Sequence, residues 1–526
     1  MEMQHIYNYS VFKDIGWRAP IPEGYKNIRV HLIFDVKHDG RHRARLVADG
    51  HLTNVPTKSV YSGVVSLRGF RLLVFLAELN GLKLWATDIS SAYLEAHTRE
   101  KVTILAGPEF GDLKGHRLAI DRALYGLRTS GQRWHDRFSD CMKAEGFSPC
   151  RADPDIWMRP NGDVYEYVAV YVDDLALALK DPKSFVENLE KKHGFKLKGT
   201  GPMEYHLGAD FQRDPDGTLC MSPKKYITER LSKGYHSMFG EKPSTRAVSP
   251  LEHGDHPELD DSDLLDNDGI EQYQSLIGSL QWTISLGRFD TACAVMTMSA
   301  FRTAPRIGHL DRLKRICGYL VKMQDFKIRF RTHQPDYSDL KSIPQDWHSV
   351  YGETSEMLPH DAPSPLGKSV QLTHYVDANL LHNALTGQSV TACLHFVNGT
   401  PIDWFSKKQA TVETATYGSE FVAARTCVEQ IIDLRNTLRY LGVPVETKSY
   451  MFGDNESVVN SSMNVHAKLH KRHTALSFHR VREAIASKFV DFVFLPGSEN
   501  PADILSKHWS YNSVKDVLLP LLNHHG

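Results

Sequence analysis

Apolar and polar positions along the chain predict a mixture of strands and helices. Residues 164–180 carry apolar side chains on both sides of two adjacent acids, Asp173 and Asp174, which predicts a strand, a tight turn and a second strand. Apolar residues at helical spacing predict an amphipathic helix over residues 131–145, ended by Gly146. The paired acids are therefore expected where two buried strands meet.

The C-terminal part shows a similar pattern with a longer helix. Apolar residues on one helical face run from Phe421 to Leu441, and Gly442 is a typical residue for the helix end. Residues 374–376 and 449–452, before and after this helix, are typical of strands. The pattern therefore predicts a strand, a long helix and a second strand in this order.

Two polar stretches interrupt this pattern. Residues 241–269 contain an acidic run, and residues 333–368 are rich in Pro, Ser and Asp, so both are predicted to be exposed connections. The second is long enough to be a domain boundary, which places the main division near residues 335–370.

Composition narrows the class of protein. The 526 residues predict two or three domains, and the formal net charge of -1 leaves nucleic-acid contact to local basic patches. The seven cysteines form no CxxC pair, which disfavours a disulfide scaffold or a zinc knuckle and favours a reducing compartment. The sequence contains no run of about 18 apolar residues, so it predicts no membrane-spanning helix.

The first acidic set consists of Asp88, at the end of an apolar run, with Asp173 and Asp174 about 85 positions later. Carboxylates at the ends of buried strands repel one another, and burial raises their pKa values. Such a group of carboxylates therefore favours the binding of a divalent metal. Two Mg²⁺ ions about 4 Å apart could activate a 3′ hydroxyl and stabilise a leaving oxygen. A paired Asp in a turn is also compatible with an ordinary hairpin.

The second acidic set is Asp377, Glu420, Asp454 and Asp503, each beside a regular element. The sequence segments around both sets are Asp88-Ile89-Ser90-Ser91-Ala92-Tyr93, Leu124-Tyr125-Gly126-Leu127, Tyr171-Val172-Asp173-Asp174-Leu175, Tyr375-Val376-Asp377-Ala378, Ser419-Glu420-Phe421, Gly453-Asp454-Asn455 and Pro501-Ala502-Asp503-Ile504-Leu505-Ser506-Lys507. These segments resemble the reverse transcriptase and ribonuclease H of copia-type long-terminal-repeat retrotransposons, over roughly residues 30–325 and 372–510.

This resemblance implies an α+β fold, with a palm, fingers and thumb reverse transcriptase domain followed by a ribonuclease H-like α/β domain with a mixed sheet. The implied domains are fingers and palm at 25–235, a thumb or connection segment at 236–332, a linker at 333–370 and the ribonuclease H-like domain at 371–512.

The resemblance also implies the roles of individual residues. All seven acids would be catalytic and would hold Mg²⁺, two ions per active site, with Mn²⁺ as a possible substitute. Tyr93 matches the aromatic residue under the incoming sugar, and Tyr171 belongs to the same site. Arg43 and Arg45 would reach the triphosphate. His473 or His479 would contact a phosphate near the second set.

The implied partners are an RNA template, a DNA primer, RNA–DNA hybrid and dNTPs. Basic residues at 468–472, 224–225, Arg480 and Arg482 could follow a nucleic-acid backbone, although such residues are often only solvated. The implied location is a cytoplasmic virus-like particle, with the nucleus as an alternative, and the sequence leaves the oligomeric state open.

Departures from the family pattern keep other interpretations open. Arg128-Thr129-Ser130-Gly131 stands where a glutamine, a small residue and proline are usual, and Asp49 replaces a frequent lysine. No aspartic protease or integrase motif is visible, which predicts a polymerase segment alone. A decayed or domesticated copy that binds nucleic acid without catalysis, and a chain with ribonuclease H activity alone, remain alternatives.

Overall fold

The structure, a computed structural model, describes all residues except 1, 37–41, 57–59, 61, 341–343, 446, 470 and 523–526. The chain divides into two compact units. Unit 1 contains residues 1–66, 83–161 and 166–202, and unit 2 contains residues 67–82, 162–165 and 203–526. The predicted finer domain boundaries stay predictions.

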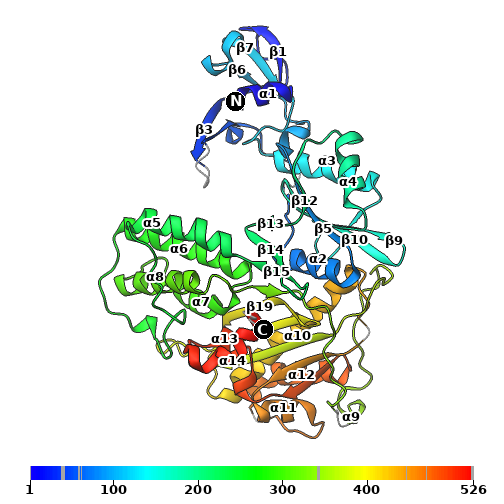
Figure 1. Cartoon of the computed structure of the whole chain (residues 1–526), viewed down its shortest axis with the longest axis vertical. Helices are drawn as coiled ribbons and strands as arrows, with labels where there is room; N and C mark the ends of the chain where they lie inside the picture. The colour runs from blue at the N-terminus through cyan, green and yellow to red at the C-terminus, as the bar shows by residue number, and fades with distance from the viewer. Residues whose placement is uncertain are drawn as a thin grey trace. The chain divides into compact units, whose positions relative to one another are not determined.

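A six-stranded sheet, the palm sheet, forms the centre of unit 1 (Figure 1). The predicted hairpin is confirmed, because β10 and β11 pair antiparallel around a two-residue turn. The predicted helix is also confirmed as α3 (Ser130–Ala144), and with α4 (Pro182–Lys191) it shares one hydrophobic core with the sheet. The strand order is β12 (Leu197–Pro202), β5 (Lys83–Ile89), β11 (Asp174–Leu179), β10 (Val164–Tyr171), β9 (Ile156–Asn161) and β8 (Ser148–Pro149).

The remainder of unit 1 has a second core and a smaller sheet. Helix α1 (Glu2–Asn8) contributes Ile6 to this core, and an antiparallel hairpin formed by β3 (Val30–Val36) and β4 (His42–Ala48) contributes Leu46 and Ala48. The sheet order is β1 (Phe12–Trp17), β7 (His116–Ile120), β6 (Val102–Leu105) and β2 (Lys26–Asn27).

Unit 2 contains a helical layer with its own core. This core includes Tyr273, Leu276 and Leu280, which are buried on α6. The helices are α5 (Ser232–Phe239), α6 (Asn267–Ser285), α7 (Ala292–Ser299) and α8 (Ile307–Lys322). Unit 2 also contains helix α2 (Leu67–Asn80) and a four-stranded sheet. The strand order of this sheet is β13 (Tyr205–His206), β14 (Ala209–Arg213), β15 (Leu219–Ser222) and β16 (Ile328–Arg329).

The C-terminal part of unit 2 is built on a five-stranded mixed sheet (Figure 1). Its order is β19 (Thr400–Lys408), β18 (Val390–Val397), β17 (Leu372–Asn379), β20 (Ser449–Gly453) and β21 (Val490–Phe494). The first three strands pair antiparallel, and β17–β20 and β20–β21 pair parallel. The prediction of a mixed sheet is confirmed, as is the long helix, α10 (Thr416–Tyr440).

Helices cover this mixed sheet and bury its apolar side chains. Phe421 and Val428 of α10 pack in one core with Phe478 of α12 and Val459 of α11. The helices after α10 are α11 (Glu456–Met463), α12 (Ala475–Ala486), α13 (Asp503–Ser506) and α14 (Tyr511–Leu522).

The two polar stretches are held more firmly than exposed connections. Although most of their residues are exposed, Asp255 and Asp260 of the first stretch bind Arg312 at 2.8 and 2.6 Å. Glu356 of the second, which also contains the short helix α9 (His348–Tyr351), binds Arg435 at 2.6 Å. Paired charges therefore anchor both segments to helices that the sequence pattern did not connect to them.

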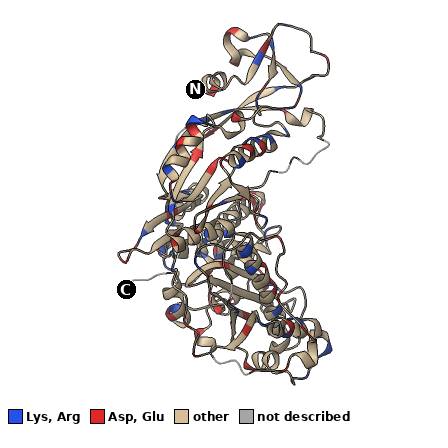
Figure 2. Ribbon diagram, turned by 90° about the vertical axis from the view of Figure 1, so that its right-hand side faces the viewer, with Lys and Arg blue, Asp and Glu red and all other residues tan. Residues whose placement is uncertain are grey.

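Basic and acidic residues are interspersed along the ribbon of both units, in agreement with the balanced composition (Figure 2). All seven cysteines are buried, and none of them forms a disulfide. Among the described residues, no helix is both long enough and apolar enough to cross a membrane.

Two buried histidines form a polar pair inside the mixed sheet. His374 on β17 and His395 on β18 are 0% and 2% exposed, and their Nδ1 atoms are 2.8 Å apart. Burial and the neighbouring imidazole hold the pKa of His374 well below its usual value, and burial also lowers the pKa of His395. The folded state therefore favours neutral rings here.

This pair predicts that unit 2 loses stability in acid. Because the pKa of His374 is lower in the folded than in the unfolded chain, the unfolded chain binds the extra proton below about pH 6.5, and stability falls as pH decreases. We expect His374→Gln to reduce this slope by up to about 1.4 kcal/mol per pH unit. Denaturant unfolding between neutral pH and about pH 5 measures it. The exposed His348→Gln is the control, and equal slopes in both variants would contradict the prediction.

Candidate functional site

The first acidic set lies at one end of the palm sheet. Strands β5 and β11 are antiparallel neighbours, and their register places Asp88 directly opposite Asp174. Asp173 lies in the two-residue turn before β11, where its carbonyl oxygen accepts a hydrogen bond of 2.8 Å from the backbone N–H of Ile89. The sheet thus brings the three predicted acids together from positions far apart in the sequence.

These acids are electrostatically strained in the absence of a cation. Burial raises the pKa of Asp174 to about 6, with further contributions from Asp173 and Asp88. Burial, followed by the charge of Asp88, also raises the pKa of Asp173. Lys198 on β12 partly offsets this, because its Nζ lies 2.9 Å from Asp88 Oδ1. An added cation would therefore be favoured here.

The turn between β10 and β11 has an unusual backbone. Val172 adopts φ +60°, which is uncommon for a β-branched residue. Its carbonyl oxygen accepts a 2.8 Å hydrogen bond from the indole Nε1 of Trp134, a side chain that is 2% exposed. Trp134 therefore supports the turn that carries Asp173, a role its place in the helical pattern did not reveal.

Two of the predicted nucleotide-binding residues line a cavity of about 870 Å³ in unit 1. Arg43 and Arg45, both on β4, line it together with Tyr125, and Arg45 Nε is buried without a hydrogen-bond partner. Guanidinium groups that line a cavity can bind an anion.

The two predicted tyrosines, Tyr93 and Tyr171, lie within a few residues of the palm acids in the sequence. Tyr93 does not line this cavity; its ring lies 5.4 Å from that of Tyr125, and its pKa is raised by burial and by the charge of Asp173. Tyr171 ends β10 and pairs with Asp174 across the hairpin. Their roles toward a substrate remain predictions.

The departure at residues 128–131 has a local structural use. Arg128 donates to the carbonyl oxygens of Gly50 and His51 at 2.9 and 3.2 Å. The Thr129 hydroxyl donates to Glu100 at 2.6 Å. Arg128 and Thr129 therefore link this segment to residues 50–51 and to Glu100, at positions where the family pattern expects other residues.

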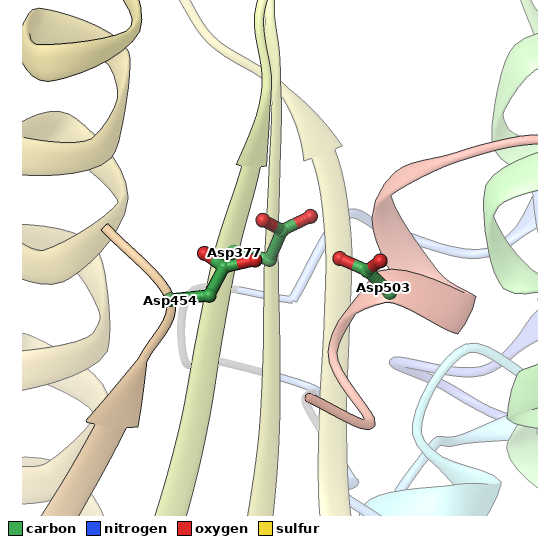
Figure 3. A group of neighbouring side chains, drawn as sticks. All are labelled: Asp377, Asp454 and Asp503. Carbon is green, nitrogen blue, oxygen red and sulfur yellow. The ribbon is translucent and has the colours of Figure 1, made fainter. Parts of the chain in front are cut away.

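The second acidic set converges at one edge of the mixed sheet (Figure 3). Asp377 lies on β17, Asp454 directly follows the parallel strand β20, and Asp503 begins α13. Each offers a carboxylate oxygen within 4.8 Å of the others. In the described part of the chain, no other group of three acidic, histidine or cysteine side chains meets this condition, so the palm acids are adjacent but less closely gathered.

Glu420 completes this second set from α10. It is 6% exposed, and burial together with Asp377 and Asp454 raises its pKa well above the usual value. Burial and Asp377 raise the pKa of Asp503 to about 7, and the same two causes raise that of Asp454. The structure therefore brings all four predicted acids together.

Three further residues contact this cluster. The Ser506 hydroxyl donates to Asp377, and Lys507 Nζ lies 2.7 Å from Asp503 Oδ1. The amide of Asn500 donates to the carbonyl oxygen of Val376 at 3.0 Å, which ties the loop before Asp503 to β17. The four-residue spacing of Asp503 and Lys507 is a helical ion-pair signal that sequence reasoning did not use.

The predicted histidines and arginines near this site have other partners. His473 Nε2 lies 3.1 Å from Glu413, and His479 Nδ1 lies 2.8 Å from the Tyr351 hydroxyl. The proposed backbone contact of Arg482 is wrong, because this side chain is 2% exposed and donates to three backbone carbonyls, those of Ser461, Asn464 and Val465. His470, inside the predicted basic run, lies outside the described residues.

The donor chemistry of both clusters fits a hard divalent cation. Every predicted ligand is a carboxylate oxygen, the donor type that Mg²⁺ and Mn²⁺ accept, and no cysteine thiolate takes part. The like charges and raised carboxyl pKa values also favour a cation at both positions.

Comparison with known proteins finds a family match for part of the chain and similar proteins over most of its length. Residues 17–238 match the family of reverse transcriptases (RNA-dependent DNA polymerases). The chain is 25% identical over 521 residues to the retrovirus-related Pol polyprotein from transposon TNT 1-94 of Nicotiana tabacum, covering 96% of this chain. Residues 17–238 are therefore similar to reverse transcriptases, and most of the chain is similar to Pol polyproteins of copia-type transposons.

The match to these copia-type relatives is partial in length. The aligned region is 36% of the tobacco protein and 32% of the Pol polyprotein from transposon RE1 of Arabidopsis thaliana, which is 23% identical over 509 residues. A putative transposon Ty5-1 protein of Saccharomyces cerevisiae, 24% identical over 349 residues, is covered over 100% of its length and 65% of this chain. The chain therefore spans about a third of the first two relatives.

Two solved structures that align with this chain have TM-scores below 0.5. The foamy viral protease-reverse transcriptase in complex with dsDNA aligns with TM-score 0.47 and 12% identity, over 94% of this chain and 81% of its own. LC11-RNase H1 in complex with RNA/DNA hybrid aligns with TM-score 0.21 and 17% identity, over 26% of this chain and 94% of its own. The fold assignment therefore depends on the strand order and pairing described above.

The contact between Trp134 and the acidic turn generates a prediction. Trp134→Phe keeps the ring but removes the N–H that binds Val172, and one such bond contributes about 1 kcal/mol. We expect backbone amides at residues 171–174 to exchange hydrogen about five times faster. Trp157→Phe, in the same core, is the control. Equal exchange in both variants would show that the indole bond does not hold the turn.

Proposed function

We propose that the chain carries out RNA- and DNA-templated DNA synthesis and cleaves the RNA strand of RNA–DNA hybrids. The observation that supports this most strongly is the presence of two separate carboxylate clusters in one chain, each at strand ends and each with raised carboxyl pKa values. Such clusters suit divalent cations and phosphoryl transfer. The match to reverse transcriptases over residues 17–238 supports the order of the two activities along the chain.

At the palm cluster, Asp88, Asp173 and Asp174 would hold Mg²⁺. Divalent cations bound there would stabilise the charge that develops when a primer 3′ hydroxyl attacks the α-phosphate of a dNTP and pyrophosphate leaves. Arg43 and Arg45 would bind the triphosphate from the 870 Å³ cavity.

At the second cluster, Asp377, Glu420, Asp454 and Asp503 would hold the cation. A bound divalent cation would lower the pKa of a water that attacks the RNA phosphodiester. Ser506 fixes Asp377 by its hydrogen bond, and Asn500 fixes the loop that leads to Asp503. His473 would act, if at all, from its exposed position beside Glu413.

Ribonuclease H activity alone is a second candidate function. Among the described residues, only the second cluster gathers three carboxylates within 4.8 Å of one another. The non-catalytic nucleic-acid-binding copy is a third possibility. By family resemblance the polymerase would work inside a cytoplasmic particle or in the nucleus, on an RNA template with a DNA primer.

Separate assays of the two clusters test the proposal. We expect the wild-type chain with Mg²⁺ to extend a DNA primer on an RNA template and to cut the RNA of a preformed hybrid. Asp173→Asn should reduce extension by about a thousandfold or more and leave cleavage intact, because it changes only the palm cluster. Asp454→Asn should do the reverse.

The possible outcomes separate the candidates. Cleavage without extension by the wild-type chain would support ribonuclease H activity alone. Binding of template–primer with neither activity would support the non-catalytic copy. If the two substitutions affected both activities equally, the assignment of one cluster to each reaction would be wrong.

The predicted position of Tyr93 under the sugar has its own test. Tyr93→Ala should raise incorporation of rNTPs relative to dNTPs by about tenfold or more, because the ring that excludes a 2′ hydroxyl is removed. Tyr93→Phe keeps the ring and should leave the ratio unchanged. Competition between a dNTP and the matching rNTP measures the ratio, and an unchanged ratio in the alanine variant would refute this role.

A further inference from the structure

The side chain of Lys507 enters the carboxylate cluster of the mixed sheet. Its Nζ lies 2.7 Å from Asp503 Oδ1 and 3.7 Å from Asp377 Oδ2. The lysine side chain is 39% exposed, and that of Asp377 is 2% exposed. The ammonium group therefore bridges a buried acid and a half-buried acid at the place where a cation is most favourable.

The local fold holds Lys507 in this position. Its backbone N–H donates to the carbonyl oxygen of Asp503 at 3.3 Å, which closes the short helix α13 and places the two side chains on one face. The preceding Ser506 donates to the same Asp377 oxygen that faces Lys507. The indole of Trp509 donates to the carbonyl oxygen of Ile504 at 3.2 Å and fixes the chain after the helix.

The positive charge is unevenly distributed over the cluster. Lys507 pairs with Asp377 and Asp503, but within the described part of the chain no Lys or Arg forms an ion pair with Asp454 or Glu420. Both of these acids feel the charge of Asp377 and have raised pKa values, for which burial is the largest cause. Lys507 acts on these two acids only from a distance, so the least compensated negative charge lies on Asp454 and Glu420, beside Asp377.

We propose that Lys507 is a built-in cation that takes the place of one divalent ion. The cluster then binds one divalent cation, through Asp377, Asp454 and Glu420, while the ammonium group neutralises Asp503. This inference rests on the proposed metal-binding role of the cluster. It removes Asp503 from the proposed ligands of the cation and departs from the two Mg²⁺ ions that the family resemblance implies.

Removing the ammonium group should therefore expose a second binding position. In Lys507→Gln the Asp503 carboxylate loses its partner and becomes available as a metal ligand beside Asp377. The lysine and a metal ion would compete for the same Asp503 oxygen. We therefore expect Lys507→Gln to raise the affinity of this cluster for a divalent cation by at least about fivefold, the lower end of typical coupling between two ligands.

The test counts Mn²⁺ ions bound to the full chain by electron paramagnetic resonance of the free ion. The palm acids also bind Mn²⁺, so each isotherm is compared with that of the same chain carrying Asp377→Asn, and the difference reports this cluster alone. We expect one ion for the wild type, two for Lys507→Gln and one for Lys507→Arg, which keeps the charge. Lys515→Gln, an exposed lysine on α14, is the matched control and should resemble the wild type.

Each other outcome overturns the proposal in a recognisable way. Two ions in the wild type, or one ion of unchanged affinity in Lys507→Gln, would show that Lys507 does not replace a metal. If Lys507→Gln fails to fold, two ions in Lys507→Arg would lead to the same conclusion. Equal isotherms for the wild type and Asp377→Asn would instead show that the cluster binds no metal, which refutes the proposed ribonuclease site itself.

Discussion

The repulsion between carboxylates at the ends of buried strands is the constraint on which both candidate sites depend. In unit 1, burial and like charges raise the pKa of Asp174 to about 6, and in unit 2 burial and Asp377 raise that of Asp503 to about 7. Such groups are costly to keep without a cation. Each cluster already holds one lysine, Lys198 or Lys507, which offsets only part of the charge.

The surrounding structure keeps these charges in place against their repulsion. Antiparallel register places Asp88 opposite Asp174, and parallel pairing of β17 with β20 brings Asp377 and Asp454 to the same edge of their sheet. The remaining acids stand at irregular points, where Trp134 supports the turn of Asp173 and Asn500 ties down the loop of Asp503. Sites on such packed elements are held more precisely than sites on free loops.

Local sequence patterns were sufficient for the elements that carry the acids, because strand alternation, helical spacing and turn residues act over short distances. They predicted the hairpin around Asp173, the long helix of Glu420 and the strands before Asp377 and Asp454. Contacts between distant segments were not predictable: Lys198 reaches Asp88 only through strand pairing, and the burial of Arg482 depends on three carbonyls supplied by another segment. Lys507 is the exception, because its spacing from Asp503 is itself a signal.

The central claim is that divalent cations bind to both carboxylate clusters and stabilise the folded chain. Thermal unfolding of the full chain with and without Mg²⁺ tests this claim most directly. A ligand that binds only the folded state raises the unfolding midpoint as its concentration increases. We expect Mg²⁺ to raise the midpoint relative to a chelator, and a chain carrying both Asp173→Asn and Asp377→Asn to lose most of that increase. A midpoint of the wild-type chain that does not respond to Mg²⁺ or Mn²⁺ would contradict the account.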